Sequence, residues 1–480
     1  MIKWLSKKIN VVNLPLIFLL ALALGVISST LLSWPGLKIL LFLPLPIAII
    51  SLSFSLLRKN PLPLLLVVVF FGGTMLPIVY KTIYIRPVVP GCGIYTLQSV
   101  KPIGRSFLEL GLKSEQGNLA VKTKSDKQFE LSDDLKVCFS QEQVKVAGEY
   151  KSYYLSRYQT EQLVETDEIK FVSSHKSVRK SFAILTDKIN SVFLVLMPGN
   201  AGQLAKGLLF GDPEFSDTFS SQIKKSGLTH IVAVSGYNVS IILVVMFGLL
   251  RKYTGKRAAF WLSIGGLIGF CLLSGGSSSV VRAAIMGLCA IIGKMAGRKS
   301  QGLNLLTLAG VLMLLYNPFL IYDIGFQLSF VATTGIFFSE KVIGLIQIPR
   351  FETLIKILAE TICAQIFCFG IILYHFGTVT LIGLFSNIFI LPLVPLAMLL
   401  VAILLVIGLA NIELALLCNI FLGLPVLYIK KVIEIFSLPT VGVFSLTGFG
   451  LGGLLVYYLL VVMVVFYITM KYDQKQQKQV

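Results

Sequence analysis

The sequence is short of charge, and of acidic and imidazole side chains in particular. Only 14% of its 480 residues are charged, and its Asp and Glu total 23 against 42 Lys and Arg. It has three histidines, His175, His230 and His375, and no Cys-x-x-Cys pair. A zinc or two-metal hydrolytic site needs several such ligands close together. We therefore expect no metal site, no cofactor and no hydrolytic centre of that kind.

Apolar residues dominate instead, at 55% of the chain and a mean hydropathy of +0.84. A soluble protein cannot shield that much apolar surface from water, so the sequence predicts a polytopic α-helical membrane protein. Segments near the ~20 residues needed to cross a bilayer number about 11 or 12. They lie near 13–33, 37–57, 61–80, 228–250, 258–275, 277–295, 303–320, 323–340, 357–376, 380–409, 412–429 and 449–470. Pro392 and Pro395 predict that the 380–409 segment is kinked or forms two pieces.

The net charge of +19 reflects in part where the loops lie, because cytoplasmic loops collect Lys and Arg; an anionic partner is the other explanation. Placing the basic loops inside gives an N-terminus in the cytoplasm and residues 81–190 outside the cytoplasmic membrane. These basic residues are Lys3, Lys7, Lys8, Arg58, Lys59, Arg251, Lys252, Lys256, Arg257, Lys294, Arg298 and Lys299. The assignment leaves Lys430 and Lys431 on the outer surface.

The polar region 81–190 alternates like a small all-β module. Its runs GIYTLQSV, RSFLELGL, NLAVKTK, DLKVCFS and QVKVAGEY are separated by turn residues. Five such strands suit a closed, extracytoplasmic barrel of the OB type, followed by a helical piece, KSYYLSRYQTEQL. An oxidising compartment favours a Cys92–Cys138 disulfide, with two free thiols as the alternative.

The charge of this β domain is only mildly positive, at +4. A basic groove with aromatic side chains is the pattern that binds single strands. The domain either binds DNA or is purely architectural. The basic residues that would contact DNA are Arg105, Lys122, Lys124 and Lys127.

Residues 191–227 form a predicted linker of two amphipathic helices, separated by the turn GDPEFSD. The expected organisation is thus three N-terminal spans in 1–80, a β domain in 81–190, this linker, and a second membrane domain in 228–480.

Four stretches in the second half resemble one family in the same order. They are LAKGLLFGDPEFSDTFSSQIKKSGLTHIVAVSGYNVSIIL, LSGGSSSVVRAAIMG, NPFLIYDIGFQLSFVATTG and LYHFGTVTLIGLFSNIFILPLVPLAM. On these motifs the chain resembles the ComEC-type competence proteins, in a form lacking the metallo-β-lactamase-like nuclease domain. The resemblance implies a channel that imports single-stranded DNA across the cytoplasmic membrane during natural transformation. It also implies an outer DNA receptor, a separate nuclease and a cytoplasmic helicase or motor as partners.

One departure concerns the first motif. Asn238 stands where the family carries a second histidine, and Tyr237 replaces the usual leucine. Any role that depends on imidazole at that position is therefore not expected here.

A strand crossing a bilayer needs a wet path lined by polar groups. Arg282 lies within an apolar segment, where an unpaired charge is costly, so we expect it to contact phosphate or to pair with Asp323 or Glu360. Asp323 would otherwise cap the helix that follows it.

The other predicted lining residues are mostly neutral. Gln327 and Gln365 either donate hydrogen bonds to phosphate or join helices to each other. His375 either stacks on bases or belongs to an interfacial aromatic belt, and Asn387 lies at a predicted helix break. His230, Ser235, Gly236 and Asn238 would form the polar half of the first motif.

Two rival functions remain open on sequence grounds. One is transport of another anionic solute or polymer through the same kind of path. The other is a membrane-embedded enzyme, which would need clustered intramembrane acids or histidines. His230 and Ser235 do not supply such a site, because residues five apart point about 140° away from each other on a helix.

Overall fold

The computed structural model describes isolated positions from residue 69 to residue 85 and most of residues 90–479. The longest gaps after residue 90 are 147–153, 296–301 and 347–351. The first two predicted spans and most of the third therefore lie outside the described residues. The chain divides into two compact units. One comprises Met1–Ala183 and Asn304–Phe326, and the other comprises Ile184–Leu303 and Gln327–Val480.

A seven-stranded sheet is formed where five strands were expected. All five predicted runs are strands: β1 (Gly91–Ile103), β2 (Phe107–Ser114), β3 (Gly117–Lys124), β4 (Asp133–Phe139) and β5 (Val144–Val146). β6 (Gln162–Glu165) and β7 (Ile169–Ser174) extend it to the order β5-β6-β3-β2-β1-β4-β7. The prediction of a closed barrel is wrong for the described residues. β6 pairs in parallel with β3 and β7 pairs with β4, and the sheet ends in β5 at one edge and β7 at the other, which do not pair with each other.

Alternation of apolar side chains explains which face of the sheet is buried. Leu135 and Val137 in β4 are fully buried, and Lys136 between them is not. They join Leu97, Leu110 and Leu119 in one core, because residues two apart in a strand share a face. The predicted helical piece contributes Tyr154 and Tyr158, whose rings pack against Ala120.

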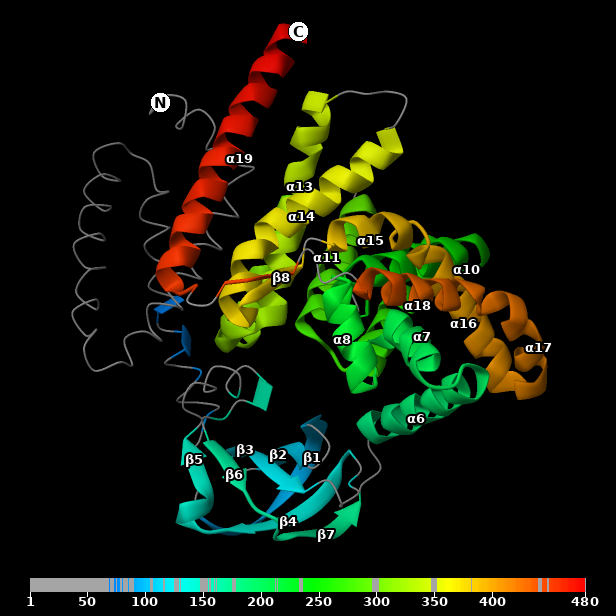
Figure 1. Ribbon diagram of the computed structural model, residues 1–480. Coiled ribbons are helices and arrows are strands. Elements are labelled where there is room, and N and C mark those ends of the chain that lie inside the picture. The colour runs from blue at the N-terminus through cyan, green and yellow to red at the C-terminus, as the bar shows by residue number, and fades with distance from the viewer. Residues whose placement is uncertain are drawn as a thin grey trace. The chain divides into compact units, whose positions relative to one another are not determined.

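Many helices make up the rest of the described chain (Figure 1). They are α6 (Val178–Leu196), α7 (Asn200–Phe210), α8 (Asp217–Lys225), α9 (Thr229–Val232), α10 (Gly236–Leu273), α11 (Ser278–Met295), α12 (Gly302–Tyr316), α13 (Ile324–Ile346), α14 (Glu352–Phe376), α15 (Gly383–Ile390), α16 (Val394–Ala410), α17 (Ile412–Leu422), α18 (Leu424–Ser437) and α19 (Leu451–Gln479). A 3₁₀ turn, η4 (Pro318–Tyr322), precedes α13, and two short strands, β8 (Thr378–Thr380) and β9 (Val443–Ser445), pair with each other.

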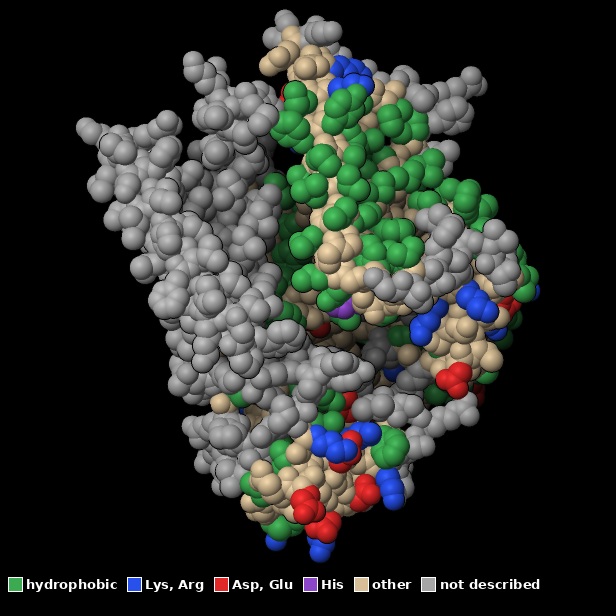
Figure 2. Space-filling view, turned by 60° about the vertical axis from the view of Figure 1, so that its left-hand side comes forward, with side chains coloured by type: hydrophobic (Ala, Val, Ile, Leu, Met, Phe, Trp, Pro, Cys, Tyr) green, Lys and Arg blue, Asp and Glu red, His purple; other side chains and the backbone are tan. Residues whose placement is uncertain are grey.

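Four of these helices are long and apolar enough to cross a membrane, or six if each of two bent pairs counts as one span. The single helices are Met246–Leu273, Ile324–Ile346, Ile355–Phe376 and Leu451–Gln477. α11 and α12, each predicted as a span, are shorter apolar helices. The described residues thus fit a multi-pass membrane protein. In the space-filling view hydrophobic side chains cover the long helices, whereas charged side chains of both signs gather on the strands (Figure 2).

Proline and glycine determine where the helices break. α15 and α16 meet at a bend of 54°, which confirms the break expected at Pro392. α17 and α18 bend by 52° just before Pro425, where a single span had been predicted. Proline lacks the N–H that would continue the helical hydrogen bonds. Within α10, Gly255 has φ of +78°, so the helix is interrupted between the two predicted spans there.

Helices α7 and α8 match the two predicted in the linker, and the turn GDPEFSD separates them. These helices were expected to be amphipathic, with one face exposed, and the structure differs. Leu204 and Leu208 of α7 are fully buried in a core with Phe193 of α6, Val401 of α16 and Ile429 of α18. The linker is therefore an inner part of the helical unit. α6 also runs through residue 190, where we placed the end of the β domain.

The three longest unbroken helices, α13, α14 and α19, lie side by side (Figure 1). The hydroxyls of Tyr457 and Tyr458 in α19 donate to the carbonyls of Ile366 and Phe367 in α14, at 2.6 and 2.8 Å. Lys475 donates to the carbonyls of Gly344 and Leu345, at 3.0 and 3.2 Å. Because the last carbonyls of a helix have no partner within it, Lys475 caps the end of α13.

In the sheet, Cys92 and Cys138 are disulfide-bonded and lie opposite each other in β1 and β4. The two cysteines are 46 positions apart in the sequence. We expect replacement of both by serine to destabilise the sheet by about 4 kcal/mol, since a cross-link restricts the unfolded chain. Proteolysis of the full-length protein in increasing urea measures this. Replacement of the free thiol Cys271 by serine is the control. Equal resistance of both variants would contradict the prediction.

Candidate polar path in the helical unit

Arg282 is the most deeply buried cation of the helical unit as the structure describes it, at 6% exposure. Its Nε donates to Ser329 Oγ and its Nη1 to Thr333 Oγ1, both at 2.8 Å. The guanidinium also lies 6.0 Å from the Phe330 ring, and Nη1 contacts Met286 Sδ at 3.5 Å. The ion pairs found among the described residues do not include Arg282. The structure thus holds the charge among hydroxyl, sulfur and ring partners.

Local packing places this side chain between two helices. One face of α11, with Val280, Ala283 and Ala284, is buried against α10. Arg282 instead faces Ser329 and Thr333, which are four apart and so share a face of α13. Thr333 Oγ1 donates its proton to the Ser329 carbonyl at 2.7 Å, which leaves its lone pairs for the guanidinium.

A third hydroxyl group, that of Ser279, belongs to the same cluster. Ser279 Oγ lies 3.1 Å from Ser329 Oγ, so the serine run before Arg282 joins the same network. A guanidinium has five N–H donors. The Nη2 group of Arg282 has no partner among the described residues, so the site can still donate to a phosphate oxygen.

Asp323 does not neutralise this cation. Its Oδ1 accepts the backbone N–H of Phe326 at 2.6 Å, which is the geometry of an N-cap. The capping role expected from the sequence is therefore confirmed.

Gln327 and His375 are brought together from separate motifs. His375 Nε2 lies 3.0 Å from Gln327 Oε1, which joins the first turn of α13 to the last turn of α14. Tyr374 packs edge-on against the imidazole, with ring centroids 5.0 Å apart. Tyr374 and His375 are both exposed. This pair therefore presents one polar and one aromatic surface at the end of α14.

A third polar group surrounds a close contact of two glycines. A Cβ added at Gly227 would lie 2.6 Å from Gly383 Cα, and one at Gly383 would lie 3.3 Å from Gln365 Nε2. Ser386 donates to the Ser226 carbonyl at 2.9 Å across the same contact. Only residues without a side chain allow the turn before α9 to touch the start of α15 so closely.

His230 and Asn387 lie beside this contact. His230 lies in the short helix α9, and its imidazole interacts with the side chain of Asn387. Asn387 is buried at 3% exposure, and its Oδ1 has no partner at hydrogen-bonding geometry among the described residues. Ser235 lies outside the described residues. Gly236 begins α10, which contains Asn238, whose side chain is likewise outside the description.

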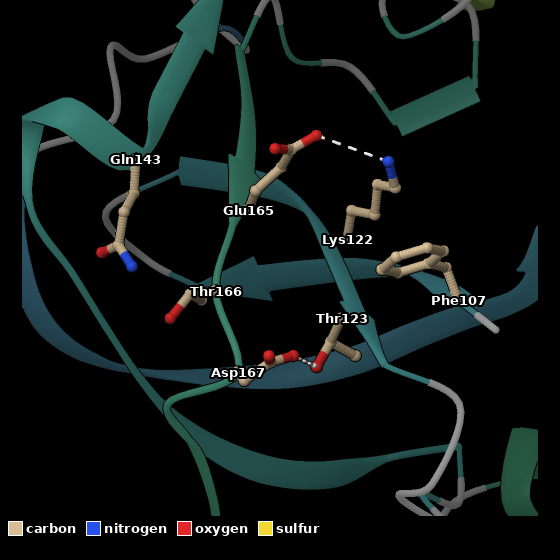
Figure 3. A pocket seen from close by; sticks show the side chains of 7 residues that line it. All are labelled: Phe107, Lys122, Thr123, Gln143, Glu165, Thr166 and Asp167. Carbon is tan, nitrogen blue, oxygen red and sulfur yellow. Dashed lines mark hydrogen bonds and ion pairs between the residues drawn. The ribbon is translucent and has the colours of Figure 1, made fainter.

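The sheet has a separate pocket of about 270 Å³ (Figure 3). Lys122 lies over the Phe107 ring, 4.7 Å from its centroid, and forms an ion pair with Glu165 at 3.5 Å. Lys145 pairs with the same carboxylate, and Lys124 pairs with Asp167 at 3.6 Å. The hydrogen bond from Lys145, with a smaller contribution from Lys122, lowers the pKa of Glu165. Arg105 and Lys127 lie outside the described residues.

Sequence reasoning missed three participants in these sites. Thr333 was overlooked although its spacing of four from Ser329 marks a shared helix face. Lys145 and Glu165 were overlooked because their strands are far apart in sequence and meet only where β5 pairs with β6.

Comparison with known proteins gives a consistent result. A family model described as "Competence protein" matches residues 208–471. The chain is 26% identical over 200 residues to "ComE operon protein 3" of Bacillus subtilis, a match covering 41% of this chain and 25% of that protein. It is 27% identical over 132 residues to an uncharacterized protein of Aquifex aeolicus, covering 27% of this chain and 31% of that one. The matches thus span a third or less of these relatives. No solved structure matches the chain.

The glycine contact leads to a test of the packing around His230. Gly227 has φ of +73° and no room for a Cβ. We expect Gly227→Ala to lower the stability of the detergent-purified protein by at least about 1–2 kcal/mol, because a side chain is unfavourable in the left-handed region. The shift in melting temperature measures it. Gly248→Ala is the control, since Gly248 is helical with open space around it, and it should be neutral or stabilising. Equal melting temperatures of the two variants would refute the prediction.

Proposed function

The chain belongs to the competence-protein family, and from that membership we propose that it acts in DNA uptake by competent cells. Within that role it forms the path by which single-stranded DNA crosses the cytoplasmic membrane. The N-terminus lies in the cytoplasm and the sheet outside it. An outer DNA receptor, a separate nuclease and a cytoplasmic helicase or motor act on the same strand.

The observation that carries this proposal is the buried Arg282 with its hydroxyl partners. A phosphate brought into hydrocarbon is very costly, so a path needs donors that replace its water. A carboxylate beside Arg282 would compete with phosphate for the guanidinium, whereas Ser329 and Thr333 hold it through neutral oxygens. The positive charge of Arg282 is therefore not neutralised by its partners and remains available to attract a phosphate.

The remaining polar groups support transport more than retention. Gln327, Gln365 and Asn387 are neutral, and neutral hydrogen bonds are about half as strong as charge-assisted ones. A strand must be held weakly enough to move on. One cation among several amides and hydroxyls meets both requirements, and it gives no preference for particular bases.

The sheet would bind the strand before it crosses. Phe107 is 39% exposed and offers a face on which any base can stack. Lys122 and Lys145 share the single carboxylate of Glu165, so these three side chains together carry one net positive charge. Binding there would be weak, as an entry site requires.

The first test concerns charge at position 282. We expect Arg282→Glu to reduce entry of labelled DNA into the cytoplasm at least about tenfold, since a hydrogen bond to a charged group contributes about 1.5–3 kcal/mol. Arg282→Lys should retain part of the activity, because it keeps the charge and loses the two-atom donor geometry. Uptake of fluorescent DNA by competent cells measures both, with protein level determined in parallel.

Arg251→Glu provides the matched control, since Arg251 is exposed and undergoes the same reversal of charge. It should leave DNA entry unchanged. Normal entry with normal protein level in Arg282→Glu would remove Arg282 from the path. Unchanged DNA entry in cells lacking the gene would reject the proposed function as a whole, and transport of another anionic solute would then be the alternative.

The second test concerns the sheet. Glu165→Gln frees Lys122 and Lys145, so we expect tighter binding of a labelled single-stranded oligonucleotide by the full-length protein. The slope of log K against log salt should steepen by up to about 1.4, or about 0.7 for each lysine released. Lowering the pH through the depressed pKa of Glu165 should act in the same direction, because protonation removes the same negative charge.

Glu142→Gln is the control for this measurement, since Glu142 is exposed in the turn before β5 and makes the same change in net charge. Fluorescence anisotropy across a salt series gives both quantities. Identical slopes for Glu165→Gln and Glu142→Gln would show that this face of the sheet does not contact DNA.

A further inference from the structure

The two bent helix pairs border an apolar pocket of about 470 Å³. Phe389 of α15, with Pro392 and Leu393 of the bend that follows, forms one wall. Leu424, Pro425 and Tyr428 of α18 form the other. Charged side chains are absent from both walls as the structure describes them. The pocket therefore lies where the two proline breaks prevent neighbouring helices from packing along their full length.

The large apolar side chains of this pocket are about half exposed. Phe389, Leu424 and Tyr428 are 52%, 54% and 43% exposed. Contact of this apolar surface with water is unfavourable, and a hydrocarbon chain that enters the pocket removes apolar area from water. In a protein with helices long enough to cross a bilayer, the abundant molecule with such a chain is a lipid.

A cationic pair follows the pocket on the same helix. Lys431 is three residues after Tyr428 and seven after Leu424, so it shares their face of α18, about 4.5 Å along the axis from Tyr428. It is 70% exposed. Lys430 and Lys431 both pair with Glu434, at 3.9 and 3.4 Å. Lys430 lies about 160° from Tyr428 around the helix, so Lys431 is the cation at the rim of the pocket. The two lysines and Glu434 together carry one net positive charge.

We propose that this pocket binds an anionic phospholipid, with one acyl chain between Phe389 and Tyr428 and the phosphate headgroup at Lys431, where Lys430 adds to the local positive charge. The apolar walls match the chain, and the net positive rim matches the headgroup. A second copy of this protein fits less well, because it would have to cover Lys431, and charged residues are depleted at the centres of protein interfaces. Lipid binding here does not require a role of the protein in DNA uptake.

Native mass spectrometry of the full-length protein tests this binding. The protein is released from micelles containing equal amounts of phosphatidylglycerol and phosphatidylcholine with the same acyl chains. We expect bound phosphatidylglycerol to exceed phosphatidylcholine roughly fivefold, as one net charge near a membrane surface supplies. Lys430→Gln with Lys431→Gln should abolish this preference. Lys252→Gln with Lys256→Gln, two exposed lysines of α10, should leave it intact.

A second pair of variants separates the pocket from its charged rim. Leu424→Trp fills the pocket and should reduce retention of both lipids, whereas Leu427→Trp, on the same helix and outside the pocket, should not. Equal retention of the two lipids by the unaltered protein would overturn the proposal. So would full phosphatidylglycerol retention in Leu424→Trp, or a lipid-free dimer mass that Leu424→Trp converts to monomer.

Discussion

The structure depends on one constraint: polar groups inside an apolar helical unit must find their partners within the protein. Arg282 meets it through Ser329 and Thr333 on the facing helix, and the half-buried Gln327 meets it through His375. Each partnership joins residues of different helices that are about 50 positions apart in sequence. The polar residues thus determine which helix faces meet, in a unit where apolar side chains alone would accept many arrangements. The same groups are the ones a charged strand would encounter.

Breaks in the helices follow from the same constraint. Non-helical backbone exposes N–H and C=O groups, which is tolerated at membrane depth only where protein or a polar cavity surrounds them. Gly227 and Gly383 bring two such segments into direct contact, and Ser386 and Thr380 bond to the carbonyls left on the other side. The proline bends at α15–α16 and α17–α18 border an apolar pocket instead, although Phe389 in its wall is only two residues beyond Asn387 on α15. One kind of break therefore serves polar residues, and the other opens an apolar pocket.

In the sheet, the charged side chains lie on exposed surface and are paired with one another. Its basic residues are largely balanced by acidic ones across strands, as with Glu165 between Lys122 and Lys145. Such pairs on an exposed surface stabilise little, and their main effect is on net charge. An entry site would have to bind a DNA strand weakly, so this partial neutralisation would suit the role proposed for the sheet.

The sequence by itself determined the membrane class, the five strands, the break at Pro392, the interruption between residues 250 and 258, the cap at Asp323 and the family. These features rest on local signals, such as apolar length, alternation, backbone preferences and ordered motifs. Only the tertiary structure decided that the sheet has two more strands and open edges, and that α7 belongs to a core. It also decided that Arg282 is held by Ser329 and Thr333 and that His375 meets Gln327. Such pairings join residues about 50 positions apart. The periodicity of one segment shows which face of that helix is polar, but it does not show which helix packs against that face.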